Sequence, residues 1–369
     1  MVQVLLVSKP LVPPWNDSSK NLARDLARSM TDHTPVVLTT READIQLGRA
    51  RLERPYSAVR KGLQTSMLDH ARVVRCLAFG SRRDLWHFFF APNPRTSRVA
   101  RLLRSVRRVS TVHTVCSAPR RDLDWKRLLF ADITVTVSRA TQERFIEVGV
   151  PAERLRRVAP CVPDLLPLSA LDRDRVCRFL GLDPERPLVV YPGDLEFGNG
   201  ARRIIEALGH LPAGLGVQLA MACRAKTDRA RHEQQALRLF GEKMKLAPAI
   251  AWLGDTPAIL RLLGAADVVA LPAEDYYAKM DLPLALLEAM SLARPVLVLQ
   301  GTPAAELTSH GGAVATEHSA GAVAAMIQTL VEDPEYAEKL GRRAREVALR
   351  DYAPKAMAER YEQLYDSLL

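Results

Sequence analysis

Ten short apolar runs alternate with helical patterns along the 369-residue chain, and this alternation constrains the fold more than any other feature. The runs are continuous rather than alternating in polarity, which is typical of parallel strands buried on both faces of a sheet. They cover residues 2–8, 34–40, 84–92, 109–115 and 131–138 in the first half and 186–193, 216–222, 249–255, 266–272 and 294–301 in the second. Regular strand–helix alternation predicts an α/β protein with two doubly wound parallel sheets.

A proline-rich stretch at residues 158–174 separates two halves of different charge. Residues 1–165 contain 29 basic and 15 acidic side chains, a net charge of +14, whereas the remainder has 23 and 27, a net charge of −4. We therefore predict a first domain over 1–165 and a second over 166–352, with the final helix, 353–369, packing back on the first. Because ligands bind at the carboxyl ends of parallel strands, we expect a cleft between the two domains.

Other functional classes find little support in the composition. No apolar run reaches the roughly 20 residues that span a bilayer, and the first ten residues predict a buried strand rather than a signal peptide. Five widely spaced cysteines without metal-ligand spacing favour reduced thiols and a cytoplasmic location. The basic charge lacks any nucleic-acid-binding motif, so we expect no nucleic-acid partner.

Several stretches resemble the GT-B glycosyltransferases, in particular the retaining, family 4-like (group 1) enzymes. The strongest are 253–273, 282–298 and 333–352, and weaker ones are 8–27 and 131–158. The resemblance implies two Rossmann-like domains, with a nucleotide-sugar donor on the second and a glycan, lipid-linked or small-molecule acceptor on the first. It implies bacterial polysaccharide or glycoconjugate synthesis, domain closure during transfer, no cofactor and no metal.

Glu288 lies in a stretch that predicts a helix buried nearly all round, followed at once by a strand. An unpaired carboxylate there costs several kcal/mol, so we expect it to be hydrogen-bonded. In the resembled family the matching glutamate, the second of an E-x7-E pair, accepts from the donor ribose hydroxyls, which implies a catalytic and donor-binding role. The alternative is a structural ion pair with Arg294.

Two departures from the family pattern affect the donor site. Met280 replaces the first glutamate of the pair, so Lys279 and Asp281 are the polar residues expected to contact the donor sugar. Asp281 and Pro283 suit a helix start, so amides near Leu284 can receive the donor.

Asp194 and Asn199, which come after Gly193, replace the Arg and Lys that hold the donor diphosphate in the family. Losing one such contact costs about 2.7–4 kcal/mol of barrier, and an acid there adds repulsion. The pairs Arg202/Arg203 and Arg224/Lys226 are possible replacements. Without replacement, the alternative is a GT-B pseudoenzyme or binding protein; a nucleotide-sugar epimerase is a third hypothesis, which the helix around Glu288 disfavours.

In the first domain, His113 ends a strand and matches a family histidine near the transferred sugar, which implies a catalytic role; a structural role is the alternative. His87 more simply packs near its strand end. The loop before the first helix carries hydrogen-bonding side chains that could contact the acceptor substrate. The alternative is that they only cap the helix N-terminus. The residues of this loop are Asn16, Asp17, Ser18, Ser19 and Lys20. An Asp-x-Asp sequence at 122–124 lies in a polar loop and gives little support for a metal site.

Residues 95–109 predict a basic amphipathic helix. Its apolar stripe consists of Val99, Leu102, Val106 and Val109, and its polar side consists of Arg98, Arg101, Arg104 and Arg108. Such a helix can bind anionic lipid headgroups and hold the protein peripherally at the inner face of the plasma membrane. The alternative is a helix packed on the sheet with a solvated basic face.

Overall fold

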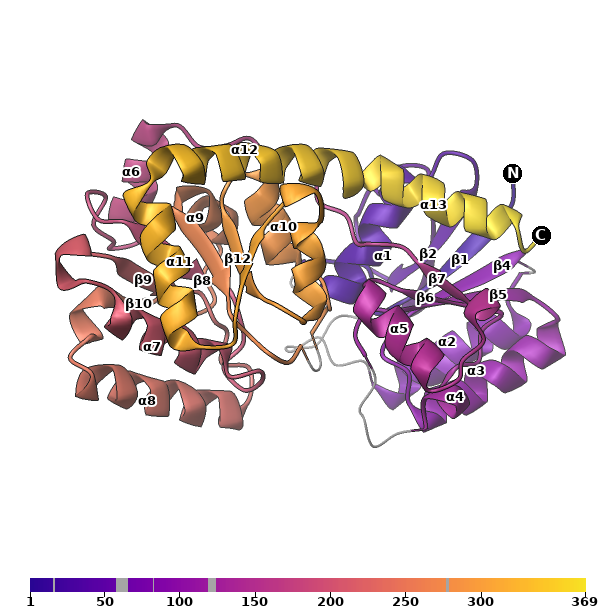
Figure 1. Ribbon diagram of the computed structural model, residues 1–369. Helices are drawn as coiled ribbons and strands as arrows, with labels where there is room; N and C mark the ends of the chain where they lie inside the picture. Colours follow the sequence, from indigo (N-terminus) through magenta and orange to yellow (C-terminus); the bar gives the residue numbers. More distant parts are fainter. Residues whose placement is uncertain (16, 58–65, 82, 119–123, 277–278) are drawn as a thin grey trace. The chain divides into compact units, whose positions relative to one another are not determined.

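The computed structural model describes the chain except for residues 16, 58–65, 82, 119–123 and 277–278, and it divides into two compact units (Figure 1). Unit 1 comprises Met1–Cys161, Ala278–Asp281 and Pro354–Leu369; unit 2 comprises Val162–Tyr277 and Leu282–Ala353. The division lies close to the predicted boundary at residue 165, and the last helix belongs to unit 1. Among the described residues, no helix is both long and apolar enough to cross a bilayer.

Unit 1 contains a seven-stranded parallel sheet in the order β3-β2-β1-β4-β5-β6-β7. Helices α1 and α13 pack together, and α3 packs beside both α2 and α4. The elements are β1 (Gln3–Val7), α1 (Ser18–Ser29), β2 (Thr34–Thr40), β3 (Arg51–Tyr56), α2 (Met67–Phe79), β4 (Leu85–Phe89), α3 (Pro94–Arg107), β5 (Ser110–Val115), α4 (Trp125–Leu128), β6 (Ile133–Thr136), α5 (Arg139–Glu147), η1 (Ala152–Arg154), β7 (Leu155–Arg157) and α13 (Pro354–Asp366).

Unit 2 contains a six-stranded parallel sheet in the order β10-β9-β8-β11-β12-β13. Its elements are α6 (Ala170–Phe179), β8 (Leu188–Tyr191), α7 (Gly200–His210), η2 (Ala213–Leu215), β9 (Gln218–Met221), α8 (Asp228–Lys243), η3 (Ala247–Ala249), β10 (Ile250–Trp252), α9 (Ile259–Ala265), β11 (Val268–Leu271), α10 (Leu284–Ser291), β12 (Val296–Leu299), η4 (Pro303–Gly311), β13 (Val314–Thr316), α11 (Ala320–Glu332) and α12 (Pro334–Asp351).

The predicted α/β class with two parallel sheets is confirmed, and each of the ten predicted runs contains a strand. Three described strands, β3, β7 and β13, were not predicted. All three lie at sheet edges, where one side of the strand is unpaired and the side chains are partly solvated. Continuous apolarity is typical of central strands, so this criterion did not detect the three edge strands.

Buried polar contacts attach α13 to the sheet of unit 1. Tyr365 Oη lies 2.6 Å from His87 Nδ1, and Thr114 Oγ1 lies 2.7 Å from His87 Nε2. Tyr361 Oη completes the cluster 2.9 Å from the Thr114 hydroxyl. Complete burial lowers the pKa of His87 well below its usual value, so the imidazole is neutral at pH 7. His87 is therefore a core residue, as the sequence indicated.

Candidate active site

Both sheets reverse their strand order at the centre, between β1 and β4 in unit 1 and between β8 and β11 in unit 2. Ligands of open α/β sheets bind outside the carboxyl ends of the two strands at such a reversal. In unit 2 the loop after β8 carries Gly193, Asp194 and Asn199, and α10, which comes after β11, carries Leu284 and Glu288. The topology thus brings the predicted donor-binding residues of unit 2 to one edge of one sheet.

Glycines let the loop after β8 approach the loop after β11. Gly198 has φ +74°, and a Cβ there would lie 2.4 Å from the Asp275 carbonyl oxygen. A Cβ on Gly200 would lie 2.9 Å from the Ala273 Cβ, and Glu274 N donates to Gly198 O at 2.9 Å. The sequence pattern did not predict this role for the two glycines, although the repeated glycine of "GNG" is the signal that could have found them.

Asp194 shapes its own loop. Its Oδ1 accepts hydrogen bonds from the backbone N–H groups of Glu196, at 2.6 Å, and Phe197, at 3.1 Å. The buried Tyr191 hydroxyl donates to the Asp194 carbonyl oxygen at 2.9 Å, close to Gly193. The carboxylate that replaces a family cation therefore has a structural task, which the comparison of residue types alone did not predict.

Asn199 adopts a left-handed conformation, φ 56° and ψ 6°, at the N-cap of α7, and its side chain makes no capping hydrogen bond. The two arginines of the first turn have structural contacts. Arg202 lies over the Phe240 ring, 4.4 Å from its centroid. Arg203 is buried; it donates to the Pro272 carbonyl oxygen at 2.8 Å and pairs with Glu274. These contacts favour the structural interpretation of both arginines.

The helix that carries Glu288 is less buried than expected. In α10 the side chains of Leu286, Leu287, Ala289, Met290 and Ser291 are buried, whereas Leu284, Ala285 and Glu288 are half-buried. Residues four apart lie on one face of a helix, so Leu284 and Glu288 share an accessible stripe. The expectation of a helix buried nearly all round is wrong for that stripe. Pro283 is the N-cap and provides no capping side chain.

The structure assigns other neighbours to Arg294, the alternative partner of Glu288. Its guanidinium donates to the Ala266 carbonyl oxygen at 3.3 Å. Burial lowers the pKa of Arg294, which the charge of Asp267 partly offsets. Arg294 thus has a local role between α10 and β11.

The loop after β9 holds the second pair of cations. Arg224 is half-buried, with Nε 3.7 Å from Asp255 Oδ1, and Lys226 is exposed. Thr227 Oγ1 donates to Glu196 Oε1 at 2.6 Å, which ties this loop to the loop after β8. Both cations therefore belong to the same edge of the sheet as Asp194 and Asn199.

Residues 279–281 belong to unit 1 rather than to the start of α10. The Asp281 carboxylate is 2% exposed, and its Oδ2 accepts from the hydroxyls of Ser138, at 2.7 Å, and Thr141, at 2.5 Å. Burial raises the pKa of Asp281, and these hydroxyl donors partly oppose the rise. Asp281 thus anchors the segment and does not cap α10; Lys279 is half-buried and Met280 is buried.

In the predicted acceptor loop, Asn16 lies outside the described residues. Asp17 caps α1: its Oδ1 accepts from the Lys20 backbone N–H at 3.1 Å and from the Ser19 hydroxyl at 2.7 Å. Burial alone would raise the pKa of Asp17, but hydrogen bonds from Lys9 and Ser19 outweigh it and lower the pKa to about 2. Ser18 begins the helix and is half-buried.

Lys20 is fully buried, and its Nζ donates to the carbonyl oxygens of Val12, at 2.7 Å, and Pro14, at 2.8 Å. Burial lowers the pKa of this amine. The Nζ also lies 5.3 Å from the centroid of the half-buried Trp15 ring. Lys20 therefore stabilises the loop through buried hydrogen bonds to its backbone. Trp15, which the sequence pattern did not indicate, adds a half-buried aromatic ring to the same loop.

His113 lies within β5 and is fully buried. Its ring stacks on Phe130, with centroids 4.8 Å apart, and contacts the tilted Phe90 ring at 4.9 Å; Nε2 donates to the Phe90 carbonyl oxygen at 2.9 Å. Burial lowers the pKa of His113 to about 4. This placement favours the structural alternative over the catalytic role implied by the resemblance.

Among the described residues, no group of three His, Cys, Asp or Glu side chains could hold a metal ion. Of the Asp-x-Asp sequence, Asp122 and Leu123 lie outside the described residues. Asp124 caps α4 and pairs with Arg127 at 3.1 Å.

Two family models match the chain: "Glycosyl transferases group 1" over residues 172–347 and "Glycosyltransferase Family 4" over residues 18–164. Solved structures of similar fold span the whole chain. They include Anabaena HepE in complex with UDP-glucose (17% identity, TM-score 0.78, 100% of both chains), a glycosyltransferase from Rickettsia africae (14%, 0.78, 100% and 98%) and sucrose-phosphate synthase from Thermosynechococcus elongatus (19%, 0.76, 100% and 99%). No curated protein sequence matches significantly.

Proposed function

We propose, from the premise that this chain belongs to the group 1 glycosyltransferases of the GT-B fold, that it moves a sugar from a nucleotide-sugar to an acceptor hydroxyl with retention of configuration. Because the similar HepE structure contains UDP-glucose, a UDP-hexose is the first donor we expect. The acceptor is a glycan, a lipid-linked sugar or a small molecule in bacterial polysaccharide or glycoconjugate synthesis. The proposal keeps the cytoplasmic location and the peripheral membrane contact expected from the sequence.

One observation carries the donor site. Among the α-helices whose N-cap the structure describes, α7, α9 and α10 have no side-chain cap. Two of these, α7 and α10, come after the strands β8 and β11, where the strand order reverses. Uncapped N-terminal amides, together with the helix dipole, favour an anion such as a diphosphate. We place the donor diphosphate there and propose Arg224 and Lys226, in the loop after β9, as the cations that contact it.

Glu288 supports the nucleotide end of the same site. It lies one turn after the α10 N-terminus, on the stripe that it shares with Leu284. A carboxylate can accept from two vicinal hydroxyls, and charge strengthens both hydrogen bonds. We therefore assign Glu288 to the donor ribose. Leu284 would contact the donor at the helix start.

The test is thermal unfolding with UDP-, GDP-, ADP- and TDP-sugars, followed by turnover with the donor that binds. A donor at about 100 times its Kd adds roughly 2.7 kcal/mol of stability. We expect one donor to raise the Tm of the wild type and of the surface control Glu242→Gln, but not of Glu288→Gln. A donor shift that survives Glu288→Gln contradicts the ribose assignment. A product of inverted anomeric configuration contradicts retention.

A further inference from the structure

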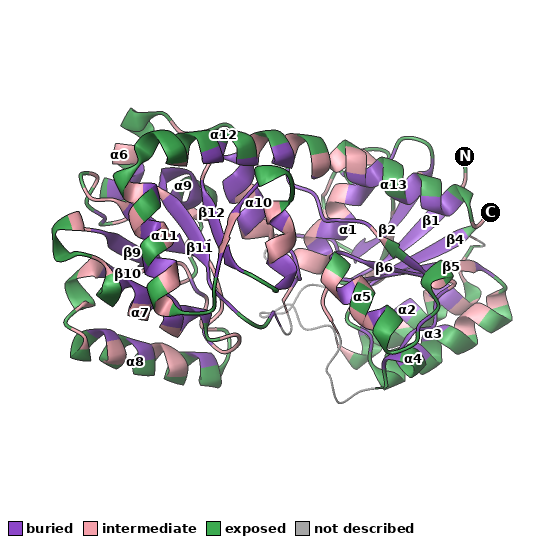
Figure 2. Cartoon of the chain, in the orientation of Figure 1, coloured by how far each residue is buried: buried purple, intermediate pink, exposed green. Residues whose placement is uncertain are grey.

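Glu274 is the first exposed residue after β11, at the sheet edge where the donor site is proposed. Figure 2 shows the strand itself, Val268–Leu271, as buried, and the next two residues are buried as well. The Glu274 side chain is 44% exposed, and its backbone N–H donates to the Gly198 carbonyl oxygen at 2.9 Å. Gly198 immediately precedes Asn199, the N-cap residue of α7. Glu274 therefore lies beside one of the uncapped helix ends at which we place the donor diphosphate.

A buried arginine holds the Glu274 carboxylate in place. The side chain of Arg203 in α7 is 8% exposed; it pairs with Glu274 Oε1 and donates to the Pro272 carbonyl oxygen at 2.8 Å. Charge strengthens the hydrogen bond between the guanidinium and the carboxylate, so Glu274 has a defined position. Among the described residues, no hydrogen bond or ion pair uses the other oxygen, Oε2. That oxygen is therefore available to accept from a ligand.

His318 brings a second acceptor next to this carboxylate. It follows β13 in the chain, and its side chain is 50% exposed. Its Nε2 donates at 2.7 Å to the carbonyl oxygen of Gln300, the residue after β12. Donation from Nε2 makes Nδ1 of the neutral imidazole an acceptor. This Nδ1 lies 3.9 Å from Glu274 Oε1, so two acceptors are neighbours and neither has a hydrogen to donate to the other.

Two adjacent acceptors suit a ligand that donates hydrogens. Sugar hydroxyls can donate, whereas an ionised carboxylate only accepts. In a nucleotide-sugar, the transferred sugar is bonded directly to the second phosphate, so a diphosphate at the α7 N-terminus brings the sugar close to Glu274. An acidic sugar would place its carboxylate against the Glu274 charge, and like charges in contact are unfavourable. The pair of acceptors therefore favours a neutral sugar rich in hydroxyl groups.

We propose that Glu274 and His318 bind hydroxyl groups of the transferred sugar and select a neutral hexose over a uronic acid. The assignment rests on the glycosyl transfer proposed above, and it names the class of sugar that this donor carries. The sequence pattern indicated neither residue, because the loops after two different strands bring them together.

Calorimetric titration of the full chain with UDP, UDP-glucose and UDP-glucuronate tests the assignment without an acceptor substrate. We expect the wild type to bind UDP-glucose at least about tenfold more tightly than UDP-glucuronate, because the glucuronate carboxylate meets Glu274. Glu274→Gln removes this charge. It should weaken the binding of UDP-glucose about tenfold, abolish most of the preference against UDP-glucuronate and leave the Kd of UDP unchanged.

A second variant tests the histidine. His318→Ala removes the Nδ1 acceptor and should weaken the binding of UDP-glucose without changing that of UDP. The matched control is His210→Ala, because His210 is exposed and ends α7, at the opposite end of the helix from the proposed donor site. The control should bind all three ligands like the wild type. Equal Kd values of the two variants for UDP-glucose overturn the assignment of His318.

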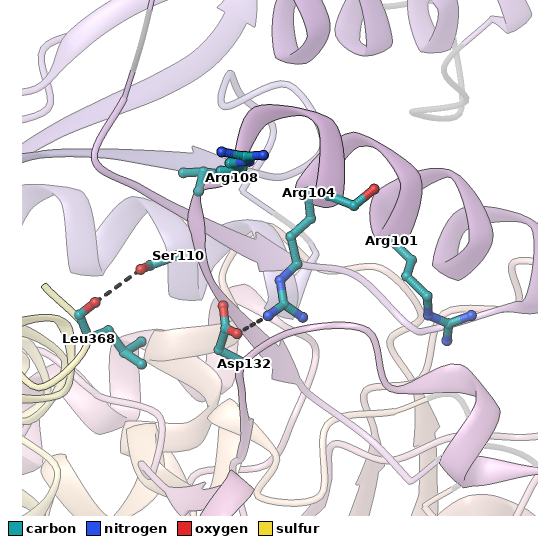
Figure 3. A pocket seen from close by; sticks show the side chains of 8 residues that line it. Arg101, Arg104, Arg108, Ser110, Asp132 and Leu368 are labelled. Carbon is teal, nitrogen blue, oxygen red and sulfur yellow. Dashed lines mark hydrogen bonds and ion pairs between the residues drawn. The ribbon is translucent and has the colours of Figure 1, made fainter.

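The loss of an ion pair as such is controlled by a second arginine–acid pair. Asp132 precedes β6, at the amino ends of the strands of unit 1, and pairs with Arg104 in a pocket at the end of α3 (Figure 3). Asp132 also accepts from Thr111 N and Oγ1, both at 2.9 Å. Asp132→Asn removes the same charge as Glu274→Gln, and it should lower the stability but leave the three dissociation constants unchanged.

The orientation of α3 fixes this control pair within unit 1. Arg104 points towards the loop before β6, where it also donates to the Phe130 carbonyl oxygen at 2.8 Å. The apolar stripe predicted for this helix is instead largely exposed. Its residues Val99, Leu102 and Val106 are 43%, 65% and 71% exposed, whereas Val109 is buried.

Three outcomes overturn the proposal. If Glu274→Gln keeps the preference of the wild type between the two sugars, Glu274 does not contact the sugar. If this variant loses affinity for UDP and UDP-glucose equally, the pair of Arg203 and Glu274 only supports the end of α7. A wild type that binds UDP-glucuronate as tightly as UDP-glucose contradicts the selection of a neutral sugar. In each case the binding of UDP still reports the proposed donor site, so the two proposals fail separately.

Discussion

The side chain of Asp194 has a structural role in its own loop, which the comparison with the family pattern did not indicate. Its position suggested repulsion of a donor diphosphate, yet its Oδ1 accepts hydrogen bonds from two backbone N–H groups of its own loop. The hypothesis of a catalytically inactive GT-B protein therefore loses support, because these hydrogen bonds account for a carboxylate at this position. The same loop leads directly into the uncapped N-terminus of α7.

Asp194→Asn distinguishes repulsion from loop support. We expect its donor KM to stay close to that of the wild type, because the amide oxygen can accept the same two hydrogen bonds. Asp194→Ala leaves both amides without that acceptor, at a cost of about 1–3 kcal/mol, and should raise the donor KM. Steady-state kinetics check this, and a large gain of donor affinity in both variants would restore the repulsion hypothesis.

His113 predicts a pH dependence of stability. Its folded pKa, about 4, lies below the unfolded value of about 6.5, so the unfolded chain binds more protons between these limits. This histidine therefore contributes stability that is complete above pH 6.5 and is lost as the pH falls towards 4, by roughly 3 kcal/mol. Burial lowers the pKa of His87 as well, so the wild type should lose stability over the same range from both residues.

Denaturant unfolding at several pH values checks this expectation. His113→Phe keeps a ring between Phe90 and Phe130 and should show a smaller loss on acidification than the wild type. A catalytic His113 would instead give a pH–rate inflection that His113→Phe abolishes, with the stability profile unchanged.

At the scale of elements, the proposed donor site depends on the close approach of the loops after β8 and β11. Gly198 meets the Asp275 backbone, and Glu274 donates to Gly198 O, so the loops after β8 and β11 form one edge. Strand order brings β8 and β11 together, but glycine sets the distance between the two loops. The donor site proposed beside the accessible stripe of α10 therefore depends on a close approach that one added methyl group would disturb.

Gly198→Ala tests this approach. Its Cβ would lie 2.4 Å from the Asp275 carbonyl oxygen, so we expect loop displacement and a donor KM at least tenfold higher. The control is Gly216→Ala, which has a similar backbone, φ +62°, and no neighbour within 4 Å. Both variants carry the strain of a left-handed alanine, about 1–2 kcal/mol. Equal donor KM values for the two variants would show that the contact does not matter.

At the scale of the whole molecule, the chain returns to unit 1 with its last helix. Glu362 of α13 is 2% exposed, and its Oε1 accepts from the backbone N–H groups of Thr31, Asp32 and His33 at 2.9, 2.7 and 3.0 Å. Tyr365 adds its contact with His87. The stability of unit 1 thus depends on residues more than three hundred positions from its first strand.

Truncation after residue 353 should therefore destabilise unit 1 selectively. Hydrogen exchange is expected to show lost protection in α1 and β2 and preserved protection in the β8–β12 core of unit 2. Glu362→Gln, which keeps one acceptor oxygen but removes the charge, should give a smaller loss. Uniform loss of protection in both units would contradict the selective role of α13.

The sequence by itself determined the central strands, the two parallel sheets and the family, because buried parallel strands are continuously apolar and the motifs lie in order along the chain. It also brought Gly193, Asn199 and Glu288 to one sheet edge, since the topology results from strand–helix alternation. Edge strands such as β3 could not be predicted in this way, because their side chains are partly solvated and their sequences are not continuously apolar.

Only the tertiary structure decided what individual polar groups do and which way α3 faces. Asp194, Asp281 and Lys20 are used by nearby backbone or hydroxyl groups that no spacing rule identifies. The periodicity of α3 names an apolar stripe but does not state whether the sheet or the outside receives it. Arginine hydrogen bonds to carbonyl oxygens on neighbouring elements settle that choice, and such contacts exist only once the chain has folded.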